Sequence, residues 1–255
     1  PGARTPLMPH RRHQVPQLPL PLEYFSATDT GRARSNNEDS VTLDQANALV
    51  VLADGMGGYN AGEVASGMAT GFIKSELGRW LQEVGIGATD PEVRRAMDIC
   101  VDNANRAIFN AANANPQYAG MGTTLVVAVF RTTRVLVGHV GDSRCYRLRG
   151  GRLTQITRDH SLLQEQIDAG LITPEQASFS ANKNLVTRAV GVEDTVLLEI
   201  HQHEVVICSA GDEAIAVLCE RGGEGLGVFD DAFLVLLELG LEGLALVLGQ
   251  GASVD

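Results

Sequence analysis

Three apolar segments of the sequence run into an aspartate that stands beside a glycine. These aspartates are Asp54, Asp142 and Asp212. Because glycine lets the backbone approach a ligand closely, a neighbouring carbonyl can join the carboxylates as a donor. Donor sets made only of oxygen suit Mg²⁺ or Mn²⁺ rather than zinc. An Asp–Gly pair by itself is most often a turn, so the repetition favours a metal site only modestly.

The elements next to the first aspartate are a strand and two helices. Residues 48–53 form a continuous apolar run, which predicts a buried strand that ends at Asp54. Apolar side chains then recur at helical spacing from Ala61 to Leu77, and a second helix begins at Asp90 and Pro91. No strand separates the two helices.

Short β-branched segments follow the two helices. They are residues 123–130, 135–140, 145–148 and 152–157. Their close spacing requires antiparallel pairing, because a parallel crossover needs about a dozen residues or more. A short helix at 161–169 and strands at 196–200 and 205–208 come next. We therefore expect an α+β fold of antiparallel sheet with segregated helices, not a doubly wound parallel fold.

Composition and charge limit the class of protein. The chain has 255 residues, 44% of them hydrophobic, and a net charge of −11 from 31 acidic and 20 basic residues. This balance predicts a globular protein, argues against nucleic acid as a partner and favours a cation-binding surface. No uncharged apolar run reaches the ~18 residues that span a bilayer. The four cysteines form no CxxC pair, which indicates reduced thiols in a cytoplasmic protein.

The first residues differ in composition from the rest. Residues 1–22 hold six of the nine prolines and no acidic residue. We interpret them as a disordered Pro-rich lead-in, and residues 23–255 as one domain.

Six motifs surround the aspartates in a fixed order. They are residues 34–39 (RSNNED), 54–58 (DGMGG), 122–124 (GTT), 141–144 (GDSR), 159–161 (DHS) and 184–191 (NLVTRAVG). In order and spacing they resemble the metal-dependent PP2C (PPM) protein phosphatase family in its compact bacterial form, over roughly three quarters of the chain. The resemblance implies a four-layer αββα sandwich of two antiparallel sheets flanked by helix pairs.

The resemblance also implies a set of metal ligands. Asp54 would bridge two divalent ions, Mn²⁺ or Mg²⁺, and the Gly55 carbonyl would bind one of them. Glu38 and Asp39 would serve the second ion directly or through water, and Asp142 would help to hold a third, weaker ion. From the residues alone, Asp142 could instead brace its own loop by an Asx turn.

The implied reaction is hydrolysis of phosphoserine and phosphothreonine on proteins by a water that the metal activates. Arg34 occupies the place of the family's phosphate-binding arginine, and its planar guanidinium suits a phosphate dianion. The expected partners are phosphorylated proteins that a Ser/Thr kinase produces. We expect a cytoplasmic monomer with no membrane partner.

Other motif residues have plainer interpretations. Asp159 and His160 are more typical of residues that structure a turn than of catalytic groups. Thr123 and Thr124 are typical of packed strand residues.

The C-terminal part departs from the family pattern. Ala210 stands where the family has an aspartate that binds a core ion, and Asp212 lies two residues further on. Residues 210–255 are divergent, with a helix-like stretch at 230–247, and we expect them to lack the last strand. Asp255 is either the family's final metal aspartate or unrelated sequence. Tyr59 and Asn60 replace a histidine of many bacterial members, so no general acid is assigned.

These departures leave a second interpretation open. A degenerate PP2C-like domain would bind metal or phosphoprotein with little or no turnover. The intact Arg34, Glu38, Asp39 and Asp54 favour the enzyme, whereas Ala210 and the divergent tail favour the binding domain.

Overall fold

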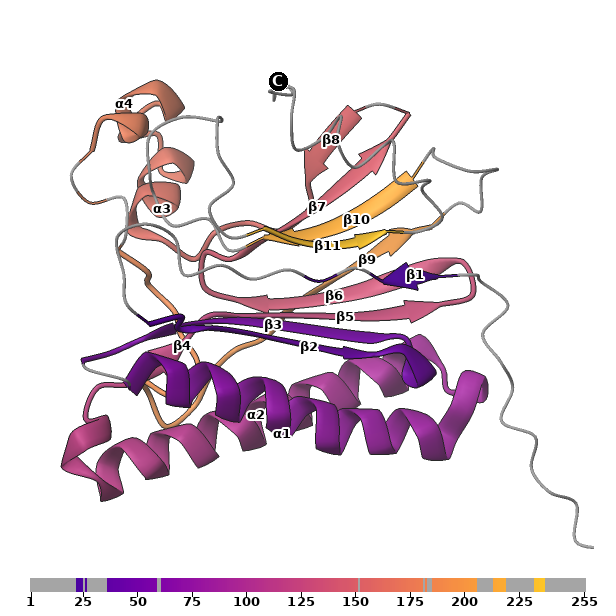
Figure 1. Cartoon of the computed structure of the whole chain (residues 1–255). Coiled ribbons are helices and arrows are strands. Elements are labelled where there is room, and N and C mark those ends of the chain that lie inside the picture. Colours follow the sequence, from indigo (N-terminus) through magenta and orange to yellow (C-terminus); the bar gives the residue numbers. More distant parts are fainter. Residues whose placement is uncertain are drawn as a thin grey trace, which may run out of the picture.

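The computed structural model describes the chain between Leu22 and Val205, with gaps, and two later strands. The described residues are 22–24, 26, 36–58, 61–150, 152–180, 182 and 185–205, together with the backbone of 213–218 and 232–236. Figure 1 shows two stacked sheets with a pair of long helices on the outer face of one of them.

The first sheet has the order β2-β3-β5-β6-β9, and β4 pairs with the end of β3. Its strands are β2 (Asp39–Asp44), β3 (Leu49–Met56), β4 (Gly122–Thr123), β5 (Leu125–Arg131), β6 (Arg134–Val140) and β9 (Glu199–Glu204). Every pair in this sheet is antiparallel. The short connections predicted this arrangement.

The second sheet has the order β1-β11-β10-β7-β8 and is also antiparallel. Its strands are β1 (Glu23–Tyr24), β7 (Arg144–Arg149), β8 (Arg152–Gln155), β10 (Glu213–Leu218) and β11 (Ala232–Leu236). It therefore pairs β1, near the start of the described residues, with the late strand β11 (Figure 1).

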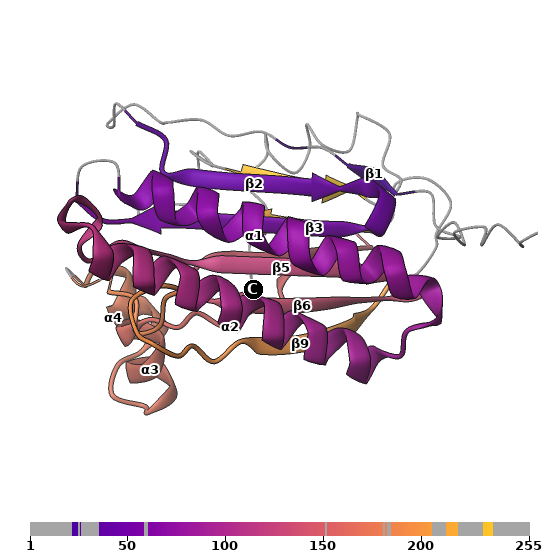
Figure 2. The same cartoon turned by 90° about the horizontal axis from the view of Figure 1, so that it is seen from below.

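Two helices cover the first sheet, as the view in Figure 2 shows. They are α1 (Ala61–Val84) and α2 (Asp90–Ala114). Thr89 caps α2 through a capping box with Glu92, and Pro91 stands in its first turn, so the sequence fixes where this helix begins. Two shorter helices, α3 (Leu162–Asp168) and α4 (Pro174–Ser178), lie at the end of the sandwich where β3 ends.

Side-chain alternation along β3 divides the interior into two cores. Leu49, Val51 and Ala53 pack against the helices, whereas Val50 and Leu52 face the space between the sheets. Successive residues of a strand point to opposite faces, so the continuous apolar run fills both cores. The residue that follows Leu52 on the inner face is Asp54.

The expectation of an α+β fold with antiparallel sheets and helices is confirmed. The described residues form three layers: a helix pair and two sheets. Within these residues no helix is both long and apolar enough to cross a bilayer.

Two details of the predicted elements were wrong. The strand predicted at 196–200 begins only at Glu199, because its partner β6 ends at Val140 and its pairing runs from Glu199 to Glu204. The helix-like stretch at 230–247 begins with β11, whose apolar residues pair with β10 and β1. Of the strand predicted at 205–208, Val205 is described and is not in a strand, and residues 206–208 lie outside the described residues, as do residues 1–21 of the lead-in.

Candidate metal centre

The ladder between β2 and β3 brings two carboxylates together. Asp39 and Asp54 are directly paired at one end of this ladder. The next pair on the same face, Val41 and Leu52, belongs to the core between the sheets, so the two aspartates continue that inner face. Like charges opposite each other destabilise a strand pair, and a bound cation would relieve this repulsion.

Glu38 and Gly55 lie directly beside this pair. The Gly55 amide donates a hydrogen bond of 2.9 Å to the carbonyl oxygen of Glu38. This bond extends the contact between the two strands by one step beyond the ladder. The two chemical groups expected at the metal site, the Glu38 carboxylate and the Gly55 carbonyl, therefore belong to adjoining backbone segments.

The start of α1 packs closely against both segments. A Cβ atom placed on Gly55 would lie 2.0 Å from the carbonyl oxygen of Gly62, which no side chain can tolerate. A Cβ atom on Gly62 would lie 2.7 Å from Oε1 of Glu38. The two glycines thus let the strand, the helix and the Glu38 carboxylate meet, and the carboxylate lies near the positive end of the helix dipole.

Hydrogen bonds to the next strands fix the backbone of Asp54. Its carbonyl oxygen accepts from the Thr124 amide and the Thr123 hydroxyl, each at 2.9 Å, and its amide donates to Oγ1 of Thr124 at 3.1 Å. Both threonines are buried. Both are packed, as predicted, but only Thr123 is a strand residue, because Thr124 lies between β4 and β5. Their hydrogen bonds hold the backbone of Asp54.

Asp142 lies in the turn between β6 and β7, at the same end of the first sheet. Leu125 at the start of β5 pairs with Val140 at the end of β6. The Ser143 hydroxyl is 2.6 Å from the Thr124 hydroxyl, which connects the turn to the neighbour of Asp54. Burial, and then the charge of Asp159, raises the pKa of the Asp142 carboxyl. A cation beside Asp142 would stabilise its ionised form.

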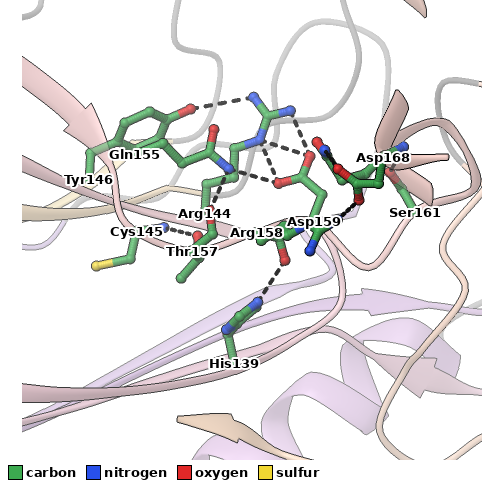
Figure 3. A network of polar contacts seen from close by, with 11 residues as sticks. His139, Arg144, Cys145, Tyr146, Gln155, Thr157, Arg158, Asp159, Ser161 and Asp168 are labelled. Atoms are coloured by element: carbon green, nitrogen blue, oxygen red, sulfur yellow. Dashed lines mark hydrogen bonds and ion pairs between the residues drawn. The ribbon is translucent and has the colours of Figure 1, made fainter. Parts of the chain in front are cut away.

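A facing segment holds this turn residue by residue, as Figure 3 shows in part. Arg144 forms a forked ion pair with Asp159. Its Nε donates to both carboxylate oxygens at 3.0 Å, and its Nη2 donates to Oδ2 at 2.7 Å. The Cys145 amide donates to the Thr157 hydroxyl at 2.9 Å. The His160 amide donates to the Gly141 carbonyl oxygen. Asp159 and His160 thus brace the turn, in agreement with their interpretation from sequence.

The donor set fits a hard divalent cation. Glu38, Asp39 and Asp54 supply carboxylate oxygens, Gly55 supplies a carbonyl, and all four lie at one end of the β2–β3 ladder. Oxygen donors without nitrogen or sulfur are the ligands that Mg²⁺ and Mn²⁺ prefer. Cys100 and Cys145 are buried free thiols and are not part of this donor set.

The remaining residues predicted for the site cannot be placed. Arg34, Tyr59, Asn60, Ala210, Asp212 and Asp255 all lie outside the described residues.

Sequence analysis did not identify Gly62 and Ser143 as supports of the site. Gly62 gives no distinctive signal, because Gly67 and Gly71 of the same helix have no neighbour within 4 Å of a Cβ atom. Ser143 carries no such signal, because its bond to Thr124 depends on the pairing of two distant segments.

Fold and site together define a two-sheet protein with an acidic, oxygen-rich centre at one end of its strands. The family model of protein phosphatase 2C matches residues 30–189, which is more than half of the chain. The chain therefore belongs to the protein phosphatase 2C family.

Two relatives illustrate this membership. The chain is 39% identical over 174 residues to the serine/threonine protein phosphatase PstP of Mycobacterium tuberculosis, which covers 68% of this chain and 32% of PstP. The chain therefore spans about a third of the length of that relative. The crystal structure of the Staphylococcus aureus serine/threonine phosphatase Stp1 matches with a TM-score of 0.68 and 31% identity, over 81% of this chain and 78% of Stp1.

A solved structure of the PstP catalytic domain contains two manganese ions. It matches with a TM-score of 0.63 and 35% identity, over 77% of this chain and 76% of that one.

Proposed function

We propose that this chain is a metal-dependent protein-serine/threonine phosphatase. The observation that carries the proposal is the meeting of Asp39, Asp54, Glu38 and the Gly55 backbone at one end of the β2–β3 ladder. Membership of the protein phosphatase 2C family supports it, as does the manganese found in the PstP catalytic domain. The cofactor is Mn²⁺ or Mg²⁺, as two core ions with a weaker third.

The residues of the chain divide the work between metal binding and substrate binding. Asp54 and the Gly55 carbonyl would hold the core ions, Glu38 and Asp39 would serve one of them, and Asp142 would hold the weaker ion. Bound divalent ions supply Lewis acidity and lower the pKa of a water, which makes that water a nucleophile at neutral pH. The carboxylates would fix where this chemistry occurs.

Arg34 binds the phosphate group of the substrate in this proposal. A guanidinium offers donors in a fork that matches two phosphate oxygens, and it cannot act as a metal ligand. Arg34 precedes Glu38 by four residues, so one short segment would supply both a phosphate contact and a metal contact. Phosphoserine and phosphothreonine proteins are then the natural substrates, with a Ser/Thr kinase as their source.

The competing proposal is a degenerate domain that binds metal or phosphoprotein with little turnover. Ala210 favours it, because alanine offers no side-chain ligand where the family has an aspartate. Asp212 or Asp255 could replace that ligand only from a different backbone position. The loss of one carboxylate would weaken the binding of one ion. Mg²⁺ tolerates such a loss less than Mn²⁺ because it demands octahedral geometry.

The decisive experiment measures hydrolysis of an aryl phosphate and of a phosphothreonine peptide with Mn²⁺, with Mg²⁺ and with EDTA. We expect activity in Mn²⁺, weaker activity in Mg²⁺ and none in EDTA. An Ala210→Asp variant should reach half-maximal activity at a lower Mn²⁺ concentration. Hydrolysis that persists in EDTA would contradict the proposal, and Mn²⁺ binding without hydrolysis in either protein would favour the degenerate domain.

The proposal extends to the organisation of the chain. We infer that residues 23–255 form one αββα domain of four layers behind a Pro-rich lead-in at 1–22, and that the domain acts as a cytoplasmic monomer. The second helix layer of this proposal would cover the outer face of the second sheet, because α1 and α2 already cover the first sheet.

A further inference from the structure

A second cluster of polar side chains lies beside the Asp142 turn. It is formed by His139 on β6, His160 after β8 and Glu199 on β9, whose potential ligand atoms lie within 4.8 Å of one another. His139 and Glu199 are directly paired between β6 and β9, and the rings of His139 and His160 stack with centroids 4.6 Å apart. By composition alone this cluster would suit a transition metal.

Hydrogen bonding argues against a metal in this cluster. The Gly141 amide donates to Nδ1 of His160 at 3.0 Å, so that nitrogen carries no proton and the neutral ring carries its proton on Nε2. Burial lowers the pKa of His160 and so favours this neutral form. A protonated Nε2 cannot bind a metal. Nη1 of Arg188 lies 3.1 Å from the same nitrogen, where its guanidinium charge would also repel a cation; with the ring proton on Nε2 this contact is not a hydrogen bond, because both groups are donors.

The same tautomer gives Nε2 a natural acceptor. Oε2 of Glu199 lies 3.2 Å from it, and Oε1 of Glu199 lies 2.6 Å from Nε2 of His201. Glu199 is therefore held by His201 on one side and can accept from His160 on the other. Its carboxylate keeps the proton of His160 on Nε2 and leaves Nδ1 as an acceptor for Gly141.

His160 satisfies both backbone groups of Gly141. Besides accepting from its amide, His160 donates its own amide to the Gly141 carbonyl at 2.9 Å. Gly141 has a φ of +101°, and a Cβ atom there would lie 2.7 Å from Cγ2 of Thr124. The turn thus has a backbone conformation that favours glycine, and it needs external bonds to stay in place. The next residue is Asp142.

We propose that His160 is a positioning residue that sets the place of Asp142 through Gly141, and that Glu199 acts through His160 by fixing its tautomer. His160 touches no substrate or metal ligand in this account. It is itself held by burial, by its stack on His139 and by the bond of the Thr187 amide to its carbonyl oxygen at 2.8 Å. The support of the weaker metal position therefore extends to β9 at the edge of the sheet.

This inference rests on the proposed phosphatase function and can be tested separately from it. In His160→Asn the amide oxygen lies near the position of Nδ1 and can still accept from Gly141, whereas His160→Gln reaches the position of Nε2 and loses that acceptor. The readout is the Mn²⁺ concentration for half-maximal hydrolysis of an aryl phosphate by the full chain, together with the rate at saturating Mn²⁺.

We expect His160→Gln to raise this midpoint about tenfold, the equivalent of one ordinary hydrogen bond, and to recover most of the parent rate at saturating Mn²⁺. His160→Asn should stay within about threefold of the parent midpoint. His203→Gln, which changes a histidine of β9 that does not bond to Gly141, is the matched control and should behave as the parent. A purely structural role would lower the melting temperature of both His160 variants and leave the two midpoints equal.

Two results would overturn the inference. One is an unchanged midpoint in His160→Gln when Asp142→Asn shifts it, which would leave the phosphatase proposal intact. The other comes from the unmodified chain: a ¹⁵N spectrum of the His160 ring that shows the proton on Nδ1 contradicts the tautomer, whether or not any variant folds. If the parent protein shows no Mn²⁺-dependent hydrolysis at all, the proposed function fails, and the spectrum still tests the tautomer.

Discussion

Asp54 and Asp142 lie at the same end of one sheet, but different interactions hold them. Asp54 is part of the β3 ladder, with β2 on one side and the threonines before β5 on the other. Asp142 lies in a turn held by the side chains of Ser143, Arg144 and His160. The first position is fixed mainly by backbone pairing and the second by side chains that come from other segments.

This difference has a consequence for the metal centre. A residue within a ladder keeps its position unless the sheet itself is disturbed. A residue in a braced turn moves when a remote partner changes. The core ions should therefore depend on Asp54 and its close neighbours, whereas the weaker position should respond to substitutions in the facing segment 157–160.

The largest expected effect separates the two aspartates themselves. Asp54→Asn should lower kcat/KM by at least about a hundredfold, because a neutral amide replaces the charge between two cations. Asp142→Asn should cost about tenfold or less and should act mainly on the Mn²⁺ midpoint. Steady-state kinetics over a Mn²⁺ titration will measure both. Equal losses in the two variants would remove the distinction between a core and a weaker position.

The next effect tests close packing behind Asp54. Gly55→Ala should lower the free energy of unfolding by about 3 kcal/mol, since the new methyl group would meet the Gly62 carbonyl at 2.0 Å. Gly58→Ala is the matched control, because a Cβ atom there has no neighbour within 4 Å. Urea denaturation of the two variants gives the comparison. A Gly55→Ala protein as stable as Gly58→Ala would show that the helix does not press on the strand.

A smaller effect tests the brace of the Asp142 turn. Arg144→Lys should lower the free energy of unfolding by about 1.5 kcal/mol, because lysine cannot make the forked contact with the mostly buried Asp159. It should also raise the Mn²⁺ midpoint. Arg79→Lys changes an exposed pair with Glu76 and should cost less than about 0.5 kcal/mol. Equal losses of unfolding free energy in the two variants would show that the forked contact between Arg144 and Asp159 does not stabilise the protein.

The smallest effect is a pH dependence from His139. Burial lowers the pKa of His139, and its buried Nδ1 has no hydrogen-bond partner within the described residues, while Nε2 donates to the Arg158 carbonyl at 2.7 Å. His160, Glu199 and His201 are the titratable groups that face it. The unfolded chain therefore takes up this proton first as the pH falls, so stability is full above the ordinary pKa of about 6.5 and declines below it.

His139→Gln provides the comparison for this pH dependence. Its amide can still donate to Arg158 but cannot titrate. Between pH 6 and pH 5 the parent should lose about 1 kcal/mol more free energy of unfolding than the variant. Urea denaturation at each pH measures the difference, and parallel curves for the two proteins would place the acid sensitivity elsewhere.

The sequence predicted the part of the fold in which local signals agree with distant pairing. The apolar run at 48–53, the capped start of α2 and the closely spaced strands all lie where these patterns placed them. The sequence placed β9 a few residues too early. This edge strand carries charged or imidazole side chains at three alternate positions, so it lacks the apolar pattern that marks a strand. The sequence also failed at β11, where a short apolar strand and a helix have the same composition.

The residues of the candidate site also divide into those that local sequence signals identified and those that only distant contacts reveal. Motif order and the strand end at Asp54 led to Glu38, Asp39 and Gly55, which the structure brings together. Contacts between segments far apart in the chain, such as Gly141 with His160 or Glu38 with Gly62, leave no local pattern in a single sequence. These contacts could be found only once the topology was known.

The central claim is that Asp54 lies between two metal ions. Crystals of the protein soaked in Mn²⁺ should show two strong anomalous peaks, each within bonding distance of an Asp54 oxygen, and crystals of Asp54→Asn should lose at least one of them. A parent crystal with no anomalous peak at Asp54, or with only one, would contradict the claim.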